Sequence, residues 1–341
     1  MFWYVAVVWM IATYVVLDGF DLGVGLLQRA LARTEEERAA CIESIGPVWD
    51  GNEVWLVAGG GCMYMAFPAL YAQGFSGFYL PLMLVLWLLT LRAIAIELRH
   101  QLHHPMWATL WDTVLAVASG TLIVVLGAAV GNLVRGVPIA DQGVFTMPLW
   151  TDLDPFGARL GVLDAYTLVV GVAALALLSL HGGLWLRDRV RGEIDGRLER
   201  VCSWLFVAVA LALAVVTAFS FAVQQNLATR VEEASWGAVF PLAAAAAWAW
   251  AYWQHRQGHS RGAFLGSCAM IYALVASAAF GTYPYVLIGA EPSTGLSLQD
   301  AAAPAYGLSV ALWWWIPGMC LILAYHWFVY SRLPQTIAVG S

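Results

Sequence analysis

Residues 2–31 read FWYVAVVWMIATYVVLDGFDLGVGLLQRAL. A bilayer core needs about 20 mostly apolar residues in a helix, and this stretch has that length. Asp18 and Asp21 lie three residues apart, so both carboxylates fall on one face of the helix. Gly19 and Gly23 have the GxxxG spacing that lets a second helix approach closely. The stretch therefore predicts a membrane-spanning helix that carries acid groups where it packs against its neighbours.

The composition of the whole chain agrees with a membrane protein. Of 341 residues, 61% are hydrophobic and 11% are charged, and the mean hydropathy is +0.74. An average soluble domain is about 45–50% apolar and about 25% charged. These values exclude an ordinary soluble enzyme, a nucleic-acid binder and a disordered protein. The 18 Trp residues suit a chain with many membrane–water boundaries.

Nine stretches of the chain are long and apolar enough to cross a bilayer. They cover residues 2–31, 52–72, 75–98, 112–134, 161–186, 202–225, 235–254, 263–288 and 307–331. We expect a tight turn around Gln73 and Gly74 between the second and third spans. No linker separates a soluble domain, so residues 1–341 are expected to form a single polytopic, all-α membrane domain.

The arginines predict the orientation of these spans. The 16 basic residues are all arginine, and 13 of them fall in the connections on one side of the expected membrane or at the span ends there. The other side has Arg135, Arg159 and Arg230. Because basic residues collect on the cytoplasmic side, the N-terminus is expected outside and the C-terminus in the cytoplasm.

A second acidic motif precedes the second span. It reads Gly46-Pro-Val-Trp-Asp-Gly-Asn-Glu-Val-Trp-Leu56. Asp50 is placed to cap this helix, because a short carboxylate can accept the free N–H groups of a first turn. Capping does not explain Asn52 and Glu53, which follow directly. Glu53 also lies favourably near the positive end of the helix.

Arginine and glutamate also occur at the end of the third span. Arg92 lies deepest there, with Glu97 and Arg99 after it. An unpaired arginine inside a membrane is costly, so we expect Arg92 to pair with a carboxylate of the first two spans. Asp50, Glu53 and Asp21 are the expected partners, and Arg99 is expected nearer to water. A purely structural ion pair would explain the same residues.

Four carboxylates from two helices thus share a depth and a side of the membrane, namely Asp18, Asp21, Asp50 and Glu53. Clustered, partly buried carboxylates can exchange protons near neutral pH, as a route for proton entry requires. The plain alternatives are that Asp18 and Asp21 are solvated at the membrane surface and that Asp50 is a cap.

Metal and haem chemistry finds little support in the sequence. Haem iron is held by axial ligands such as His or Met, and His181 and His326 are the two histidines inside the expected spans. The five cysteines are widely spaced, without a CxxC pair. We therefore expect that this chain binds no haem or metal by itself.

At its motifs the chain resembles subunit II of the cytochrome bd-type quinol oxidases, including their cyanide-insensitive branch. The matching segments are Asp18-Gly-Phe-Asp-Leu-Gly-Val-Gly25, the Gly46–Leu56 motif, Ala72-Gln-Gly-Phe-Ser-Gly-Phe-Tyr79, Leu91-Arg-Ala-Ile-Ala-Ile-Glu-Leu-Arg99, Gly131-Asn-Leu-Val-Arg-Gly-Val-Pro138, Leu180-His-Gly-Gly183, Tyr283-Pro284 and the ending from Ser297 to Tyr330. They occur in the family's order and span nearly the whole chain. His326 departs from the family, which commonly has Gln there.

The resemblance implies a haem-free subunit of an enzyme of the bacterial inner membrane. That enzyme oxidises quinol, reduces O₂ to water and builds a proton gradient. Haems b and d belong to its partner, subunit I. The implied fold is two four-helix bundles and one peripheral helix. Asp21 and Asp50 match the family's cytoplasmic proton route, with Asp18, Glu53, Arg92 and Glu97 as supporting residues.

Two further ligands or partners follow from the resemblance. Some members of the family hold a structural quinone in this subunit, and one small single-span subunit is a further potential partner. Two other functions fit parts of the sequence. A proton-coupled secondary transporter would also place carboxylates and Gly-rich helices in the membrane. A purely structural assembly subunit would fit everything except the acidic cluster.

Overall fold

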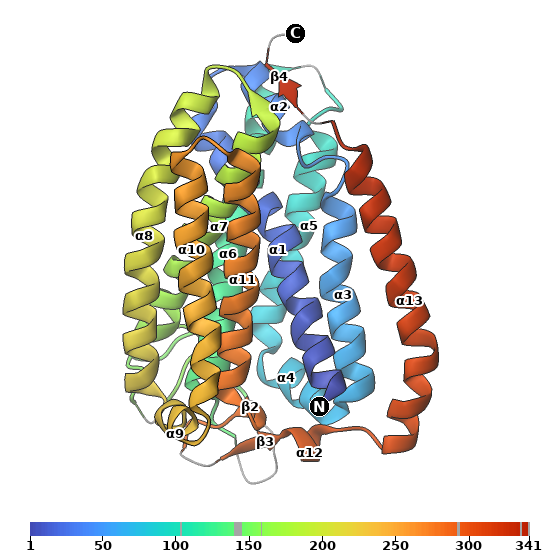
Figure 1. The fold of residues 1–341 in the computed structure, drawn as a ribbon, viewed down its shortest axis with the longest axis vertical. Helices are drawn as coiled ribbons and strands as arrows, with labels where there is room; N and C mark the ends of the chain where they lie inside the picture. The colour runs from blue at the N-terminus through green and yellow to red at the C-terminus, as the bar shows by residue number, and fades with distance from the viewer. Residues whose placement is uncertain (103, 140–144, 158, 292–293, 335, 340–341) are drawn as a thin grey trace.

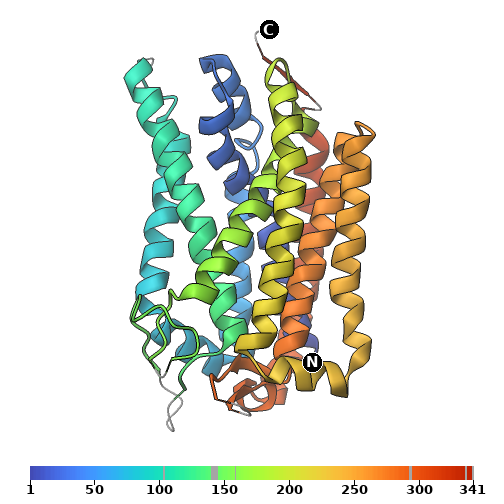
Figure 2. The same ribbon diagram turned by 90° about the vertical axis from the view of Figure 1, so that its left-hand side faces the viewer.

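The computed structural model describes residues 1–341 apart from 103, 140–144, 158, 292–293, 335 and 340–341. Most of the described chain is helical, and the long helices stand side by side (Figure 1; Figure 2). Seven helices are long and apolar enough to cross a membrane: α1 (Phe2–Leu31), α5 (Tyr79–Leu98), α6 (Pro105–Arg135), α7 (Ala165–Arg189), α8 (Ile194–Val223), α11 (Ser260–Thr282) and α13 (Ala305–Arg332). The all-α expectation is therefore confirmed in its coarse form.

Shorter elements complete the fold. The other helices are α2 (Glu35–Glu43), α3 (Trp49–Ala66), α4 (Pro68–Gly77), α9 (Asn226–Glu233), a 3₁₀ turn at Ser235–Ala238, α10 (Val239–Arg256) and α12 (Leu298–Ala301). Strands β2 (Tyr285–Ile288) and β3 (Gly295–Ser297) pair antiparallel, and β1 (Val190–Arg191) pairs parallel with β4 (Ile337–Ala338). The two chain termini lie at opposite ends, with the C-terminus at the upper end in Figure 1.

The expected second span, 52–72, is broken in the structure. Helix α3 ends at Ala66, and Phe67 leaves the helical conformation before Pro68 starts α4. A proline disfavours helical backbone at the residue before it, and this accounts for the break. The expected turn at Gln73 and Gly74 is wrong, because both residues lie inside α4.

The expected span 263–288 is also too long at its end. Helix α11 stops at Thr282, and residues 285–288 form β2. Tyr283 is extended and is followed by Pro284. Proline has no N–H to donate to the preceding turn, so a helix ends readily at this point.

Helix α1 is the central helix of the molecule. It packs most extensively against α7, α3 and α6. At its crossing with α7 the two backbones touch, because a Cβ on Gly23 would lie 2.1 Å from the carbonyl oxygen of Leu178 and 2.9 Å from the Cα of Gly182. The GxxxG spacing of the sequence therefore does mark a close helix approach, which any larger side chain at Gly23 would prevent.

The upper end is closed by charged contacts between α2 and the start of α8. Thr34 and Glu37 form a capping box at the start of α2, and Glu37 forms an ion pair with Arg197. Burial acts to raise the pKa of Glu37. Hydrogen bonds from the Arg33 N–H and from Arg197 outweigh it and hold that pKa below its usual value.

The C-terminal segment is bound at the same end. Strand β4 pairs with β1, and a guanidinium N–H of Arg189 donates to the carbonyl oxygen of Pro334 at 2.8 Å. These contacts hold the end of α13 against the connection between α7 and α8. They matter because the buried side chains of α13 are Ala311 and Met319, so this helix lies at the periphery.

The alanine variant of Gly23 tests the α1–α7 crossing. Gly23→Ala should lower the free energy of unfolding by about 1–3 kcal/mol or more, because the added methyl group meets backbone that cannot move aside. Gly196→Ala is the matched control, since a Cβ there meets nothing within 4 Å. Thermal unfolding of the detergent-solubilised protein would measure both, and equal unfolding temperatures for the two variants would contradict this interpretation.

Candidate functional site

A buried ion pair joins α5 to α1. Arg92 and Asp18 are each fully buried, and the Arg92 Nη1 donates to Asp18 Oδ1 at 2.5 Å. A second guanidinium nitrogen donates to Glu53 Oε2 on α3 at 3.4 Å. The sequence correctly predicted that Arg92 pairs with a carboxylate and included Glu53 among the partners. It missed Asp18, which makes the shorter contact.

Asp21 lies beside this pair and has a different hydrogen-bond partner. Its Oδ2 accepts a hydrogen bond from the Asn52 side-chain amide at 2.8 Å. Its Oδ1 is buried, and no described residue hydrogen-bonds to it. Asp18 Oδ2 is also buried, and no described residue hydrogen-bonds to it. The two carboxylates of α1 are thus distinct: Asp18 has a cation, and Asp21 has a neutral amide donor.

Asp50 lies apart from the buried carboxylates. It belongs to the first turn of α3 and its side chain is exposed. The capping expectation is wrong, because Val48 occupies the N-cap position and no side chain caps this helix. Asp50 shares its face of α3 with the exposed Val54, Val57 and Tyr64 at helical spacing.

Glu97 does not join the buried group either. Its side chain is exposed near the end of α5, whereas Arg92, more than one turn earlier, is fully buried. Asp18, Asp21, Glu53 and Arg92 therefore lie together with Asn52, while Asp50 and Glu97 face outward. The sequence grouped Asp50 with Asp18, Asp21 and Glu53, but Asp50 does not share the burial of Asp18 and Asp21.

A second ion pair lies at the upper end, where the sequence suggested water. Arg99 is 5% exposed, and its guanidinium donates to Asp112 Oδ1 and Glu35 Oε1, each at 2.6 Å. Arg38 also contacts Asp112. The expected span 112–134 starts too late, because α6 begins at Pro105 and Asp112 is buried inside that helix. Asp164, by contrast, does cap α7 through a capping box.

The residue that sequence reasoning missed is Tyr330 on α13. Its hydroxyl donates to Asn52 Oδ1 at 2.7 Å, so it extends the contacts of Asp21 to the peripheral helix. The available signal was its spacing of four residues after His326, which places both on one face of the last helix.

Both histidines in the membrane-spanning helices have their ring nitrogens engaged. Trp55 donates its indole N–H to His326 Nε2 at 3.0 Å, and the other ring nitrogen bonds to the carbonyl of Ile322. His181 contacts the Val16 carbonyl and the Ser267 hydroxyl. No free nitrogen lone pair is left for a metal or haem iron, and the described residues contain no cluster of His, Cys, Asp or Glu that could hold a metal ion.

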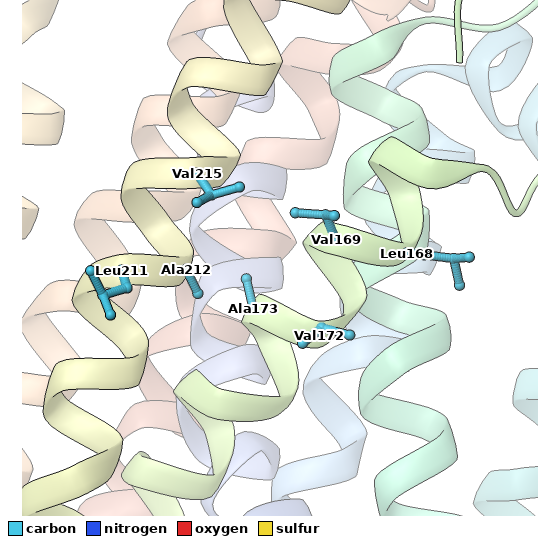
Figure 3. Close-up of a pocket in the computed structure, with 7 residues that line it drawn as sticks. All are labelled: Leu168, Val169, Val172, Ala173, Leu211, Ala212 and Val215. Carbon is cyan, nitrogen blue, oxygen red and sulfur yellow. The ribbon is translucent and has the colours of Figure 1, made fainter. Parts of the chain in front are cut away.

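Two of the grooves on the described surface lie between neighbouring helices. One of about 230 Å³ lies between α13 and the helices α1, α3 and α11. It is lined by Trp9, Thr13, Leu17, Trp55, Tyr272, Leu323, His326, Trp327 and Tyr330. The other, of about 350 Å³, lies between α7 and α8 and is lined by aliphatic side chains that face each other, such as Val169 and Val215 (Figure 3). The groove between α7 and α8 has no polar or titratable side chain in its lining, so the groove beside α13 is the better candidate for a binding site.

Comparison with known proteins places these features in a family. The model of the family described as cytochrome bd terminal oxidase subunit II matches residues 1–333. Cytochrome bd-I ubiquinol oxidase subunit 2 of Escherichia coli is 28% identical, over 98% of this chain and 94% of its own. The probable cytochrome oxidase subunit 2 of Haemophilus influenzae is 30% identical, over 97% and 93%. The resemblance seen in the motifs is thereby confirmed.

A solved structure agrees on the fold. A chain of the bd oxidase from Geobacillus thermodenitrificans superposes with a TM-score of 0.75, over 97% of this chain and 98% of that one, at 14% sequence identity. At that identity the likeness shows the fold. The roles of the site's side chains have to be argued from their own contacts.

Replacing Arg92 tests the buried ion pair. Arg92→Leu should cost about 3–5 kcal/mol of stability, because Asp18 is left as a buried charge without its cation. Adding Asp18→Asn removes that charge and should restore part of the loss. Arg29→Leu, at an exposed arginine of the same region, should be nearly neutral. Thermal unfolding and the amount of protein in membranes are the measurements. If the double variant is as unstable as Arg92→Leu, the unpaired charge of Asp18 does not account for the loss of stability.

Proposed function

The chain belongs to the cytochrome bd terminal oxidase subunit II family, and from this premise we propose that Asp21 and Asp50 carry protons from the cytoplasm towards its oxidase partner. The chain is a subunit of a terminal quinol oxidase, a quinol:O₂ oxidoreductase, and a multi-pass protein of the bacterial inner membrane. Its partner is the other oxidase subunit, and quinol is the reductant. The arrangement of the acidic residues is the observation that carries the proposal.

Nine membrane crossings with the N-terminus outside belong to this proposal. The seven long helices would be joined by α10 as one crossing and by α3 with α4 as another. The opposite positions of the two termini (Figure 1) support an odd number of crossings. The upper end would then be cytoplasmic, and it carries the arginines of α2, β1 and the start of α8. The arrangement as two four-helix bundles with α13 outside them is proposed with it.

In the proposed route, the two carboxylates of α1 have separate roles. Asp18 is fixed as the counterion of Arg92, so its charge is needed for stability. Asp21 has a neutral donor on Oδ2 and a buried Oδ1 with no described partner. Asp21 can therefore gain and lose a proton on Oδ1 without breaking the Asn52 contact. Glu53 follows the exposed Asp50 by three residues on α3 and shares Arg92 with Asp18.

The exposed position of Asp50 suits the entry of such a route. Asp50 lies at the upper end of α3, on the same helix face as Val54 and Val57. Exposed apolar side chains on one face are typical of a protein or lipid contact. We assign this face to the oxidase partner, so that Asp50 collects protons at the rim of the contact between the two subunits.

Haem belongs to the complex, and we propose that the partner, subunit I, binds haems b and d while this chain binds none. Haem iron needs an axial ligand with a free lone pair. The histidines of the proposed crossings, His181, His255 and His326, have both ring nitrogens engaged by protein groups. The haems supply the electron-transfer and O₂-reducing chemistry. The residues of this chain would support the partner and pass protons to it.

Two finer ligand and partner assignments complete the proposal. Binding sites for small molecules are mostly apolar with a few placed polar groups. The groove beside α13 fits that description with Thr13, Tyr272 and His326 among aromatic side chains, and it is where we place the structural quinone. The small single-span subunit stays a prediction.

Aspartate-to-asparagine variants of the full complex test the proton route. Asn keeps the size of Asp and cannot exchange a proton near neutral pH. Asp21→Asn and Asp50→Asn should assemble with normal haem content, while quinol-driven O₂ consumption falls by about 10-fold or more. The exposed Asp152→Asn, on the connection between α6 and α7, is the control. Full turnover of a normally assembled Asp21→Asn, Asp50→Asn double variant would return both residues to a structural role.

A histidine variant tests the haem assignment. In the assembled complex, His326→Gln should leave the absorbance bands of all haems unchanged, because the Gln carbonyl oxygen can accept the Trp55 N–H in place of the ring nitrogen. The measurement is the haem spectrum per mole of purified complex. Loss of one haem with normal assembly would show that this chain supplies a ligand after all.

A further inference from the structure

Both N–H groups and the carbonyl oxygen of the Asn52 side-chain amide are hydrogen-bonded to described residues. Its Nδ2 donates to Asp21 Oδ2 at 2.8 Å and to the carbonyl oxygen of Leu17 at 3.2 Å. Its Oδ1 accepts from the Tyr330 hydroxyl at 2.7 Å. Asn52 is fully buried, so water does not compete for these contacts.

This pattern fixes which way the amide points. Rotating the Asn52 amide by half a turn would aim Oδ1 at two acceptors, the Asp21 carboxylate and the Leu17 carbonyl. In the observed orientation the Tyr330 hydroxyl donates to the Asn52 oxygen and adds one more favourable contact. The NH₂ group of Asn52 is thereby kept on Asp21.

Tyr330 reaches this amide from a third helix. It comes from α13, whereas Asp21 lies on α1 and Asn52 on α3. The ring of Tyr330 is held independently of its hydroxyl: it stacks on His326 at a centroid distance of 6.4 Å and meets Trp185 edge-on at 6.5 Å. Removing the hydroxyl therefore leaves the packing of α13 in place.

We propose that Tyr330 is a positioning residue of the proton route: its hydroxyl orients the Asn52 amide, and the amide holds the Asp21 carboxyl in one orientation. Oδ2 keeps the Asn52 contact in both states of Asp21, while Oδ1 takes up and releases the proton. Without the hydroxyl the Asn52 oxygen loses its donor, and the amide holds the Asp21 carboxyl less firmly. The inference rests on the proposed role of Asp21 in proton transfer.

The test is a double-variant cycle in the assembled complex. Tyr330→Phe removes the hydroxyl and keeps the ring. A single neutral hydrogen bond is modest in strength, so quinol-driven O₂ consumption should fall by about 3- to 10-fold, with unchanged haem content. The solvent deuterium isotope effect on that rate should rise, because proton transfer becomes more limiting. Tyr325→Phe removes the same group from an exposed position of α13 and should change neither readout.

The combination with Asp21→Asn identifies how Tyr330 acts. If it acts through Asp21, the Tyr330→Phe, Asp21→Asn double variant is no slower than Asp21→Asn alone. If the rate losses of the two single variants multiply in the double variant, Tyr330 acts independently of Asp21, and the positioning role is overturned. A fully active Tyr330→Phe beside a slow Asp21→Asn would also overturn the positioning role, but it would leave the proton route standing. A fully active Asp21→Asn would overturn the proton route and this inference together.

Discussion

A guanidinium inside a membrane protein must be matched by a carboxylate, and the pair of Arg92 and Asp18 meets this requirement between α5 and α1. The pair fixes which faces of these two helices meet. It also brings Glu53 of α3 to the same cation. Three helices are thus tied at one depth by a charge that none of them could bury alone.

Burial of the α1 carboxylates restricts them to protein partners. Asp18 is 0% exposed and Asp21 is 1% exposed. Each buried polar atom therefore has to find a protein partner or stay without one. Asp18 finds Arg92, Asp21 finds Asn52, and one oxygen of each carboxylate stays unpaired. Burial with different partners is therefore what distinguishes these two aspartates.

The division of charge between these aspartates gives the proposed function a physical basis. A carboxylate that balances a buried arginine has to stay ionised, whereas one that faces a neutral amide is free to change its state. Two residues of the same type on one helix can then serve stability and proton transfer separately. The peripheral helix α13 enters this arrangement through Tyr330, which explains how a helix with so few buried side chains can still affect the site.

The sequence by itself determined the class of protein, most of the long helices and the family, because apolar length and the motifs around Asp18 and Asp50 are local properties of the chain. It also placed Asp18, Asp21, Glu53 and Arg92 near one another. The tertiary structure decided which of them pair. Residues three apart on a helix point about 60° apart around its axis, and only the packing of α5 and α3 selects Asp18 for Arg92 and Asp21 for Asn52. The burial of Asp112, the exposure of Asp50 and the contact from Tyr330 were hidden for the same reason, since each depends on helices that are distant in the sequence.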